Sequence, residues 1–290
     1  MSQLKPLLVK AQDDGVAVGH FNISDIVLLK AVFASARALN VPVIVGASEG
    51  ERNFLGVRQI ALLVKSLRED YGYPIFLNAD HTHSLESAIA ATEAGYDSIV
   101  FDLSALPFEE NIRQTKNAVE LLKSINPAIV IEGEIGDIGS GSEIHDAVPD
   151  HPRVLTTAPE AKFYVENTGV DVLAPAVGNM HGMVQTMVEG NLRKRLDLER
   201  IREIKNATKS LLTLHGASGT EDQDLSDAIT AGINIIHINT ELRVAWRHGL
   251  ESALASRPKE VVPYKLLPAV EAAVSDIVTG RLRLFNRVKA

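Results

Sequence analysis

Short apolar runs alternate with longer amphipathic stretches along the whole chain. The apolar runs are nearly continuous, which is typical of strands that are buried on both faces of a parallel sheet. The pattern predicts strands over Ala17–Phe21, Val43–Ala47, Ile75–Ala79, Ser98–Phe101, Ile129–Glu132, Val172–Ala174, Leu211–Leu214 and Ile233–Ile238.

The stretches between these runs carry apolar residues on one helical face. The clearest of them are Asp25–Asn40, Leu85–Ala94, Glu109–Ser124, Glu160–Thr168 and Leu198–Thr208. Eight strand–helix units in 290 residues match the count and length of a (β/α)8 barrel, also called a TIM barrel. We therefore expect an α/β fold in which the whole chain, residues 1–290, forms a single barrel domain.

Two regions exceed this minimal pattern. Asp137–Thr157 is rich in Gly, Ser, Asp and His and is too long for a simple turn, so we expect a long active-site loop there. Pro263–Arg287 follows the eighth unit and predicts a C-terminal helical extension used for packing or dimer contact.

The composition narrows the class of protein. The chain has no Cys, which excludes a disulfide framework, a thiolate metal site and a Cys nucleophile. No run approaches the roughly 18 apolar residues of a membrane helix, and the N-terminus lacks the long apolar region of a signal peptide. A formal net charge of −8 argues against a nucleic-acid surface. We expect a cytoplasmic protein without nucleic-acid or membrane partners.

Three histidines that are far apart in the sequence each follow a run that predicts a strand. His81 ends the string IFLNADH, His181 ends DVLAPAVGNMH, and His215 ends LLTLH. Residues at the C-terminal ends of parallel barrel strands meet at one mouth, where such barrels carry out their chemistry. Three neutral imidazoles at one mouth would make a catalytic zinc site with a fourth position open to substrate.

Carboxylates accompany the histidines. Asp80 directly precedes His81, so its side chain is expected to point in a different direction and to face substrate as an acid–base group. Its alternative role is to cap the following helix. Asp102 and Glu134 follow strands four and five and are either metal ligands, partners that orient the histidines, or local caps. His83 lies past the strand and is expected outside the ligand set.

Glycines follow two of the histidines and predict a phosphate site. Gly182 and the GASG string at 216–219 allow the backbone to approach a ligand closely. Gly-rich turns at helix N-termini bind phosphate through backbone N–H groups, and GASG leads into an acidic helix start. In TIM barrels the loops after strands seven and eight form this site, here Gly216–Ser218 and Asn239–Thr240. Glu143, in the long loop, is either a base on a lid or a solvated surface residue.

The segments that carry these residues resemble one family, the class II zinc-dependent ketose-bisphosphate aldolases, which include fructose- and tagatose-bisphosphate aldolases. The resemblance covers nearly the whole chain. It is carried by GHFNISD (19–25), VIVGASEG (43–50), ADH (79–81), DLSALPFEENI (102–112), IEGEIG (131–136), GNMHG (178–182), LHGASG (214–219) and INTEL (238–242).

The resemblance implies roles for the polar residues. The zinc ligands would be His81, His181 and His215. Asp80 would exchange a proton with the C4 hydroxyl of the substrate, and Asp102 and Glu134 correspond to positions that bind a second or displaced divalent metal. Other positions match the part of the site that binds substrate, where a monovalent cation often assists in the family: Asn22, Ser48, Gly182, Gly216, Ala217, Ser218, His237, Ile238, Asn239 and Thr240.

Two positions depart from the family pattern at the end of strand eight. The family sequence Lys-Val-Asn-x-(Asp or Ala)-Thr is replaced here by residues 235–240, in which His237 takes the place of Asn and Asn239 that of Asp. Glu143 matches the loop Glu that moves the C1 proton, although the spacing of the preceding glycines differs. Because both strand-eight changes fall where substrate is recognised, the aldolase chemistry is better specified than the sugar.

The function implied by the resemblance is that of a metal-dependent aldolase, a lyase of glycolysis and carbohydrate metabolism. It would reversibly cleave fructose 1,6-bisphosphate to dihydroxyacetone phosphate and glyceraldehyde 3-phosphate, as a homodimer or homotetramer. A tagatose-bisphosphate or other ketose-phosphate aldolase and a catalytically impaired metabolite-binding barrel remain alternatives. A Schiff-base aldolase is disfavoured, because the predicted strands contain no Lys and Lys209 lies at the opposite end of strand seven.

Overall fold

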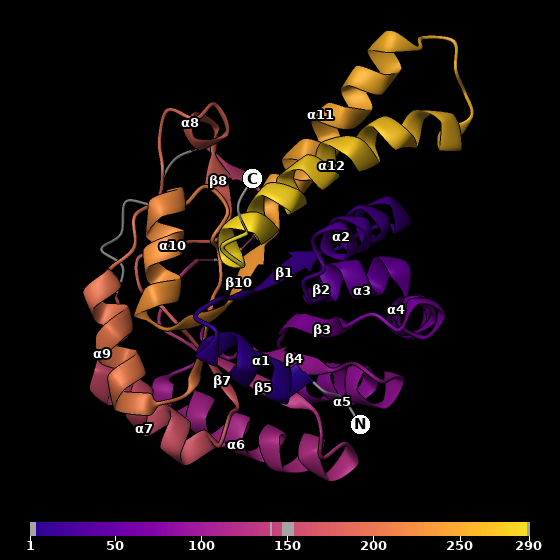
Figure 1. Cartoon of the computed structure of the whole chain (residues 1–290). Coiled ribbons are helices and arrows are strands. Elements are labelled where there is room, and N and C mark those ends of the chain that lie inside the picture. The colour runs from indigo at the N-terminus through magenta and orange to yellow at the C-terminus, as the bar shows by residue number, and fades with distance from the viewer. Residues whose placement is uncertain (1–3, 140, 147–153, 289–290) are drawn as a thin grey trace.

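The computed structural model describes residues 4–139, 141–146 and 154–288. Eight parallel strands close into a barrel in the order β1-β10-β9-β7-β5-β4-β3-β2 (Figure 1). This confirms the predicted (β/α)8 class. The barrel strands are β1 (Val18–Asn22), β2 (Val43–Ala47), β3 (Ile75–Thr82), β4 (Ser98–Phe101), β5 (Val130–Ile135), β7 (Val172–Pro175), β9 (Leu211–Leu214) and β10 (Ile233–Ile238).

Helices surround the barrel and connect its strands (Figure 1). Short strands β6 (Ile144–His145) and β8 (Met183–Val184) pair in parallel outside the barrel, so the described part of the long loop contacts the segment after β7. The rest of that loop, residues 140 and 147–153, lies outside the described residues.

The helices are α1 (Leu4–Asp13), α2 (Ile26–Leu39), α3 (Glu49–Leu55), α4 (Val57–Tyr71), α5 (Leu85–Ala94), α6 (Phe108–Ile125), α7 (Ala158–Thr168), α8 (Gln185–Val188), α9 (Leu198–Thr208), α10 (Asp222–Ala231), α11 (Thr240–Ser256) and α12 (Pro263–Phe285).

Helix α1 closes the N-terminal end of the barrel. Leu4 and Leu8 are fully buried, one helical turn apart on the same face of α1. They form one apolar cluster with residues from seven strands: Val18, Ile44, Phe76, Val130, Val172, Leu211 and Ile235. One end of the barrel is therefore filled with apolar side chains, whereas its polar side chains gather at the carboxyl end.

Helices α11 and α12 pack against each other and extend away from the barrel (Figure 1). A Cβ atom on Gly249 of α11 would lie 2.9 Å from Cα of Val270 in α12, so this close approach requires glycine. Helix α12 confirms the predicted C-terminal helical extension, ending at Phe285 instead of Arg287. Within the described ranges, no helix is long and apolar enough to cross a membrane.

Candidate active site

The three predicted histidine ligands converge at the carboxyl mouth of the barrel. The ring centroid of His81 lies 4.6 Å from that of His181 and 4.8 Å from that of His215. One nitrogen from each ring lies within 4.8 Å of the others. Three imidazoles from distant parts of the chain therefore form one cluster that could hold a metal ion.

The position of two of these histidines relative to their strands differs from the prediction. His81 lies inside β3, and His181 lies in the loop after β7, which ends at Pro175. Only His215 directly follows its strand, β9. The apolar run continues through Ala176 and Val177, which lie beyond the end of β7 and are fully buried.

An irregularity in β3 lets two neighbouring residues face the mouth. The register between β3 and β4 shifts between Ala79 and Thr82, and His81 has φ of 37°. A positive φ costs a non-glycine residue on the order of 1–3 kcal/mol, and such strain concentrates at functional sites. The side chains of Asp80 and His81 consequently share one cavity, with His81 Nε2 3.9 Å from Asp80 Oδ1, instead of pointing to opposite faces.

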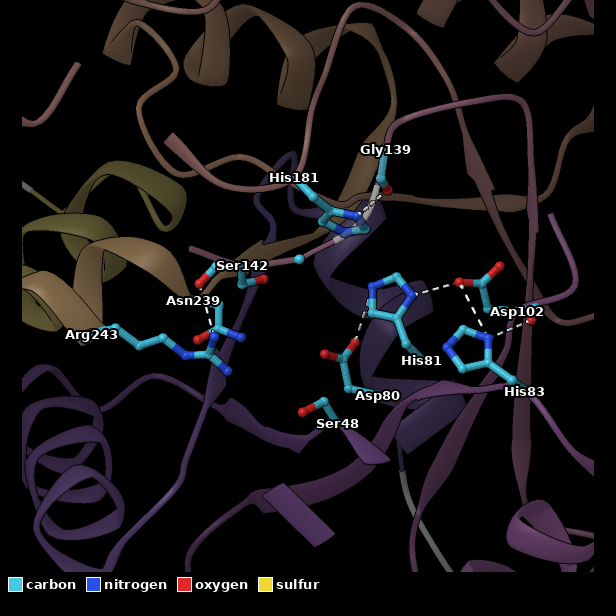
Figure 2. Close-up of a pocket in the computed structure, with 11 residues that line it drawn as sticks. Ser48, Asp80, His81, His83, Asp102, Gly139, Ser142, His181, Asn239 and Arg243 are labelled. Carbon is cyan, nitrogen blue, oxygen red and sulfur yellow. Dashed lines mark hydrogen bonds and ion pairs between the residues drawn. The ribbon is translucent and has the colours of Figure 1, made fainter. Parts of the chain in front are cut away.

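Two of the histidines are oriented by an acceptor on one ring nitrogen (Figure 2). His81 Nδ1 lies 2.8 Å from Asp102 Oδ2, and His181 Nδ1 lies 2.8 Å from the backbone oxygen of Gly139. Because the Gly139 oxygen can only accept, His181 carries its proton on Nδ1 and leaves Nε2 as a potential ligand atom. Metal-binding histidines typically show this arrangement.

His215 is likewise oriented by an acceptor, in this case a buried carboxylate. Its Nε2 lies 2.5 Å from Oε1 of Glu132, and its Nδ1 lies 2.9 Å from Oε2 of Glu134. Among the described residues, this Nδ1 and this Oε2 have no hydrogen-bond partner, since the contact lacks hydrogen-bond geometry. Buried polar atoms without partners are rare unless they bind a group that the structure does not contain. The histidine cluster and these atoms fit a divalent metal ion.

Burial and neighbouring charges shift the pKa values of these side chains, and for His81 the two effects oppose each other. Burial lowers the pKa of His181 to about 3, so its ring is neutral. Burial also acts to lower the pKa of His81, but Asp80 and Asp102 outweigh this effect and raise it to about 9. Burial and the charge of Asp102 raise the pKa of Glu134. A divalent cation bound here would displace the His81 proton, because metal ligands must be deprotonated.

Asp80 is buried and ionised. Burial acts to raise its pKa, but His81, His237 and His20 together hold it well below the usual value. Its Oδ2 accepts a hydrogen bond of 2.8 Å from Asn22, and its Oδ1 lies 3.4 Å from Nδ1 of His237. It does not cap a helix: Ser84 caps α5, accepting from the Ser87 backbone.

His20 belongs to the site although no role was predicted for it from the sequence. Its ring stacks on that of His237 with centroids 3.5 Å apart and planes 5° apart, and its Nε2 lies 3.1 Å from Oδ1 of Asn78. Burial lowers the pKa of His20 to about 4. A Cβ atom on Gly46 would lie 2.1 Å from the His20 ring, so glycine there makes room for it. The string GHFN at the end of the first strand was the available signal.

Asp80, His81, His181 and Asp102 line a cavity of about 260 Å³ (Figure 2), and an adjoining smaller pocket shares several of its lining residues. Both belong to the same mouth of the barrel. Most of the predicted substrate positions line one or both: Asn22, Ser48, Gly182, Gly216, Ser218, His237, Asn239 and Thr240. Ala217 and Ile238 do not, because their side chains pack into the apolar core.

Helix α10 follows the GASG string as predicted, but none of its described residues lines either pocket. Helix α10 begins at Asp222, and Asp224 in its first turn is bound to Arg195 and to the Leu196 N–H. The helix that begins at the cavity is α11, whose first residue, Thr240, lines the smaller pocket. Both predicted loops still reach this pocket.

Glu143 is not brought to the cavity. Its side chain is exposed and is absent from the described residues that line the two pockets, while its backbone oxygen accepts from the Met183 N–H. The neighbouring Ser142 does line the cavity, and its backbone oxygen accepts a hydrogen bond of 2.8 Å from Arg243. The role of Glu143 stays a prediction.

Sequence reasoning missed three charged residues at the mouth. Glu132, a charged residue inside a buried strand, orients His215; its alternation with Glu134 was the signal. Arg243 lines the cavity and forms a 2.8 Å ion pair with Glu51. Lys194 is 5% exposed and lies between α8 and α9, where no pattern pointed to it.

A closed parallel barrel with histidines, carboxylates and a glycine-rich rim at its carboxyl mouth is the architecture of a TIM-barrel enzyme. The description "Fructose-bisphosphate aldolase class-II" belongs to a family whose sequence profile matches residues 2–289. The chain therefore belongs to the class II fructose-bisphosphate aldolase family, whose members are aldehyde-lyases.

Individual relatives match this chain over nearly their full length. The fructose-bisphosphate aldolase of Thermus caldophilus is 32% identical, covering 97% of this chain and 97% of the relative. The probable fructose-bisphosphate aldolase of Bacillus subtilis is 33% identical, covering 97% of this chain and 95% of the relative. Among solved structures, the YdjI aldolase of Escherichia coli K12 matches with a TM-score of 0.80 and 28% identity, covering 98% of this chain and 97% of the other.

Proposed function

We propose that this chain is a zinc-dependent aldolase that reversibly cleaves fructose 1,6-bisphosphate to dihydroxyacetone phosphate and glyceraldehyde 3-phosphate. The observation that carries the proposal is the convergence of His81, His181 and His215 beside the buried, ionised Asp80. Relatives named fructose-bisphosphate aldolase support the choice of sugar.

In this proposal the three histidines would hold the zinc ion, and Asp102, the Gly139 oxygen and Glu132 fix their orientation. When bound, zinc supplies a Lewis acid that polarises the ketose carbonyl. The Oε2 of Glu134, which faces His215, is the donor we assign to a second or displaced divalent metal.

Asp80 moves the proton on the aldehyde side of the reaction. It accepts the proton of the C4 hydroxyl as the C3–C4 bond breaks, and it returns that proton in the condensation direction. Asn22 and His237 hold its carboxylate in place. We propose Glu143 as the base for the C1 proton, which requires the loop to bring its exposed side chain toward the cavity.

The substrate phosphate would lie against the Gly182, Gly216–Ser218 and Asn239–Thr240 segments, where backbone N–H groups bind anions without help from net charge. We also propose a cytoplasmic homodimer or homotetramer. Large apolar side chains on and between α11 and α12 support assembly through this pair, since exposed apolar patches mark contact sites: Leu254, Val261 and Tyr264 are 47%, 85% and 75% exposed.

A panel assay tests this function. The purified protein should cleave fructose 1,6-bisphosphate, EDTA should abolish the cleavage, and Zn²⁺ or Co²⁺ should restore it, because both ions accept imidazole ligands. The panel includes tagatose 1,6-bisphosphate and a ketose monophosphate. Full activity in chelator would refute a metal-dependent reaction, and phosphate binding without cleavage of any sugar would select the impaired metabolite-binding barrel.

His237 and Asn239 are expected to determine sugar preference. The His237 ring offers one donor and one acceptor in a geometry that differs from that of the family's amide, and Asn239 adds a donor where the family has a carboxylate. Sites that hydrogen-bond a hydroxyl discriminate strongly when a partner changes. The double variant His237→Asn with Asn239→Asp should therefore shift the ratio of kcat/KM for fructose and tagatose bisphosphates. An unchanged ratio would mean that these departures are neutral.

A further inference from the structure

A buried ammonium group joins the two loops that carry His181 and His215. Lys194 Nζ donates to four backbone oxygens, those of Met180 at 2.7 Å, Gly182 at 2.6 Å, Gly216 at 3.0 Å and Ser218 at 2.5 Å. The residue is 5% exposed. Its backbone is fixed as well, because its N–H donates to the Gly219 oxygen at 2.9 Å and its own oxygen accepts from Glu221.

This arrangement resembles the coordination of a metal cation more than a set of ordinary hydrogen bonds. An ammonium group has three protons, whereas four oxygens surround this nitrogen within 3.0 Å. Rings of backbone oxygens are the environment in which proteins bind K⁺. Because these oxygens only accept, they favour the charged form of the amine over the neutral form.

Three of the four oxygens, those of Gly182, Gly216 and Ser218, belong to positions where the family resemblance predicted a monovalent cation, and Met180 lies two residues before Gly182. That ion does not fit here, because the Lys194 ammonium fills the position between the oxygens. The loops touch directly at this point: a Cβ atom on Gly216 would lie 2.3 Å from the Met180 oxygen. With the ammonium removed, the four oxygens would lose the donor that they share inside the protein, which is costly.

We propose that Lys194 is a built-in monovalent cation. It fixes the loops of His181 and His215 relative to each other and places a permanent positive charge beside the phosphate-binding segments, so the enzyme needs no K⁺, Na⁺ or NH₄⁺. Lys194 is a positioning residue. Its ammonium, held by four oxygens, is not a nucleophile for Schiff-base chemistry, which requires the neutral amine. The charge beside the phosphate rests on the proposed aldolase function, whereas the link between the loops does not.

Wild-type protein and the Lys194→Ala variant would be compared in chloride salts of K⁺, NH₄⁺ and tetramethylammonium at equal ionic strength. Wild-type kcat/KM should be the same in all three salts. In tetramethylammonium, which is too large for the vacated space, Lys194→Ala should lose roughly 10–100-fold, the usual loss when a group that orients metal ligands is removed. K⁺ and NH₄⁺ should restore much of that activity.

The melting temperature gives a second measurement that does not depend on catalysis. K⁺ and NH₄⁺ should raise Tm of Lys194→Ala and leave Tm of the wild type unchanged. The matched control is Lys205→Ala, because Lys205 Nζ is also held by neutral oxygens, those of Gln12, Ser210 and Asn234, at the other end of the barrel. Neither its activity nor its Tm should respond to the choice of cation.

Three results would overturn the proposal: a wild-type enzyme that requires K⁺ or NH₄⁺, a Lys194→Ala variant whose Tm and activity are the same in all salts, and a variant that stays unfolded in every salt. Absence of aldol cleavage in the wild type would instead refute the proposed function. The Tm comparison would still decide whether Lys194 replaces a cation in joining the loops.

Discussion

Asp80→Asn is expected to slow carbon–carbon cleavage by roughly 10²–10⁴-fold, the usual contribution of a positioned acid–base group. The amide keeps the shape of the carboxylate but cannot take the C4 hydroxyl proton. The metal content should be unchanged, because Asp80 is not one of the three proposed ligands. Single-turnover cleavage, zinc content and Tm measured on one preparation separate the chemical step from binding and folding.

Asp97→Asn is the matched control for this variant. Asp97 is equally buried, at 3% exposed against 4% for Asp80, but it lies at the N-terminal end of β4. It accepts from Arg68 at 2.5 Å and from the Leu77 N–H at 2.9 Å, so its loss should lower Tm and leave the cleavage rate per folded molecule intact. Wild-type cleavage by Asp80→Asn, or loss of its zinc, would contradict the role we assign.

His181→Ala is expected to lose zinc and with it nearly all activity. The variant removes one of three protein ligands, so the loss of metal affinity should exceed the 10–100-fold typical of losing a group that merely orients a ligand. Equilibrium dialysis against a zinc buffer measures this affinity directly, and added Zn²⁺ should restore activity only at high concentration.

His83→Ala serves as the control because His83 is close to the ligands without being one of them. Its Nδ1 lies 2.9 Å from the backbone oxygen of Asp102, and its side chain is 56% exposed. Zinc affinity should stay near that of the wild type. Equal losses for His83→Ala and His181→Ala would mean that the proposed ligand set is wrong.

The sequence predicted the barrel well where strands are mainly apolar. The bounds of β2, β4, β9 and β10 agree with the prediction. Strands β3 and β5 run further than predicted, to Thr82 and Ile135, and the added residues include Asp80, His81 and Glu134, whose charged or polar side chains interrupt the apolar run. Apolarity is a poor guide at that end, since the barrel buries charged groups there against one another.

The site was predictable only in part, because a sequence shows local motifs but not contacts between distant residues. The family segments locate His81, His215 and Asp80 without any knowledge of their contacts. Contacts between distant residues leave no local pattern: Glu132 meets His215 across 83 positions, and the oxygens around Lys194 belong to the backbone. The ring of oxygens around Lys194 could not be predicted, because backbone oxygens are the same for every residue type.

The most direct test of the metal centre is anomalous X-ray diffraction at the zinc absorption edge, from crystals of the zinc-loaded protein. We expect one strong peak about 2.0–2.1 Å from Nε2 of His81, Nε2 of His181 and Nδ1 of His215. A peak held instead by the neighbouring group of His20, Asp80 and His237, or zinc bound only outside the barrel mouth, would contradict it.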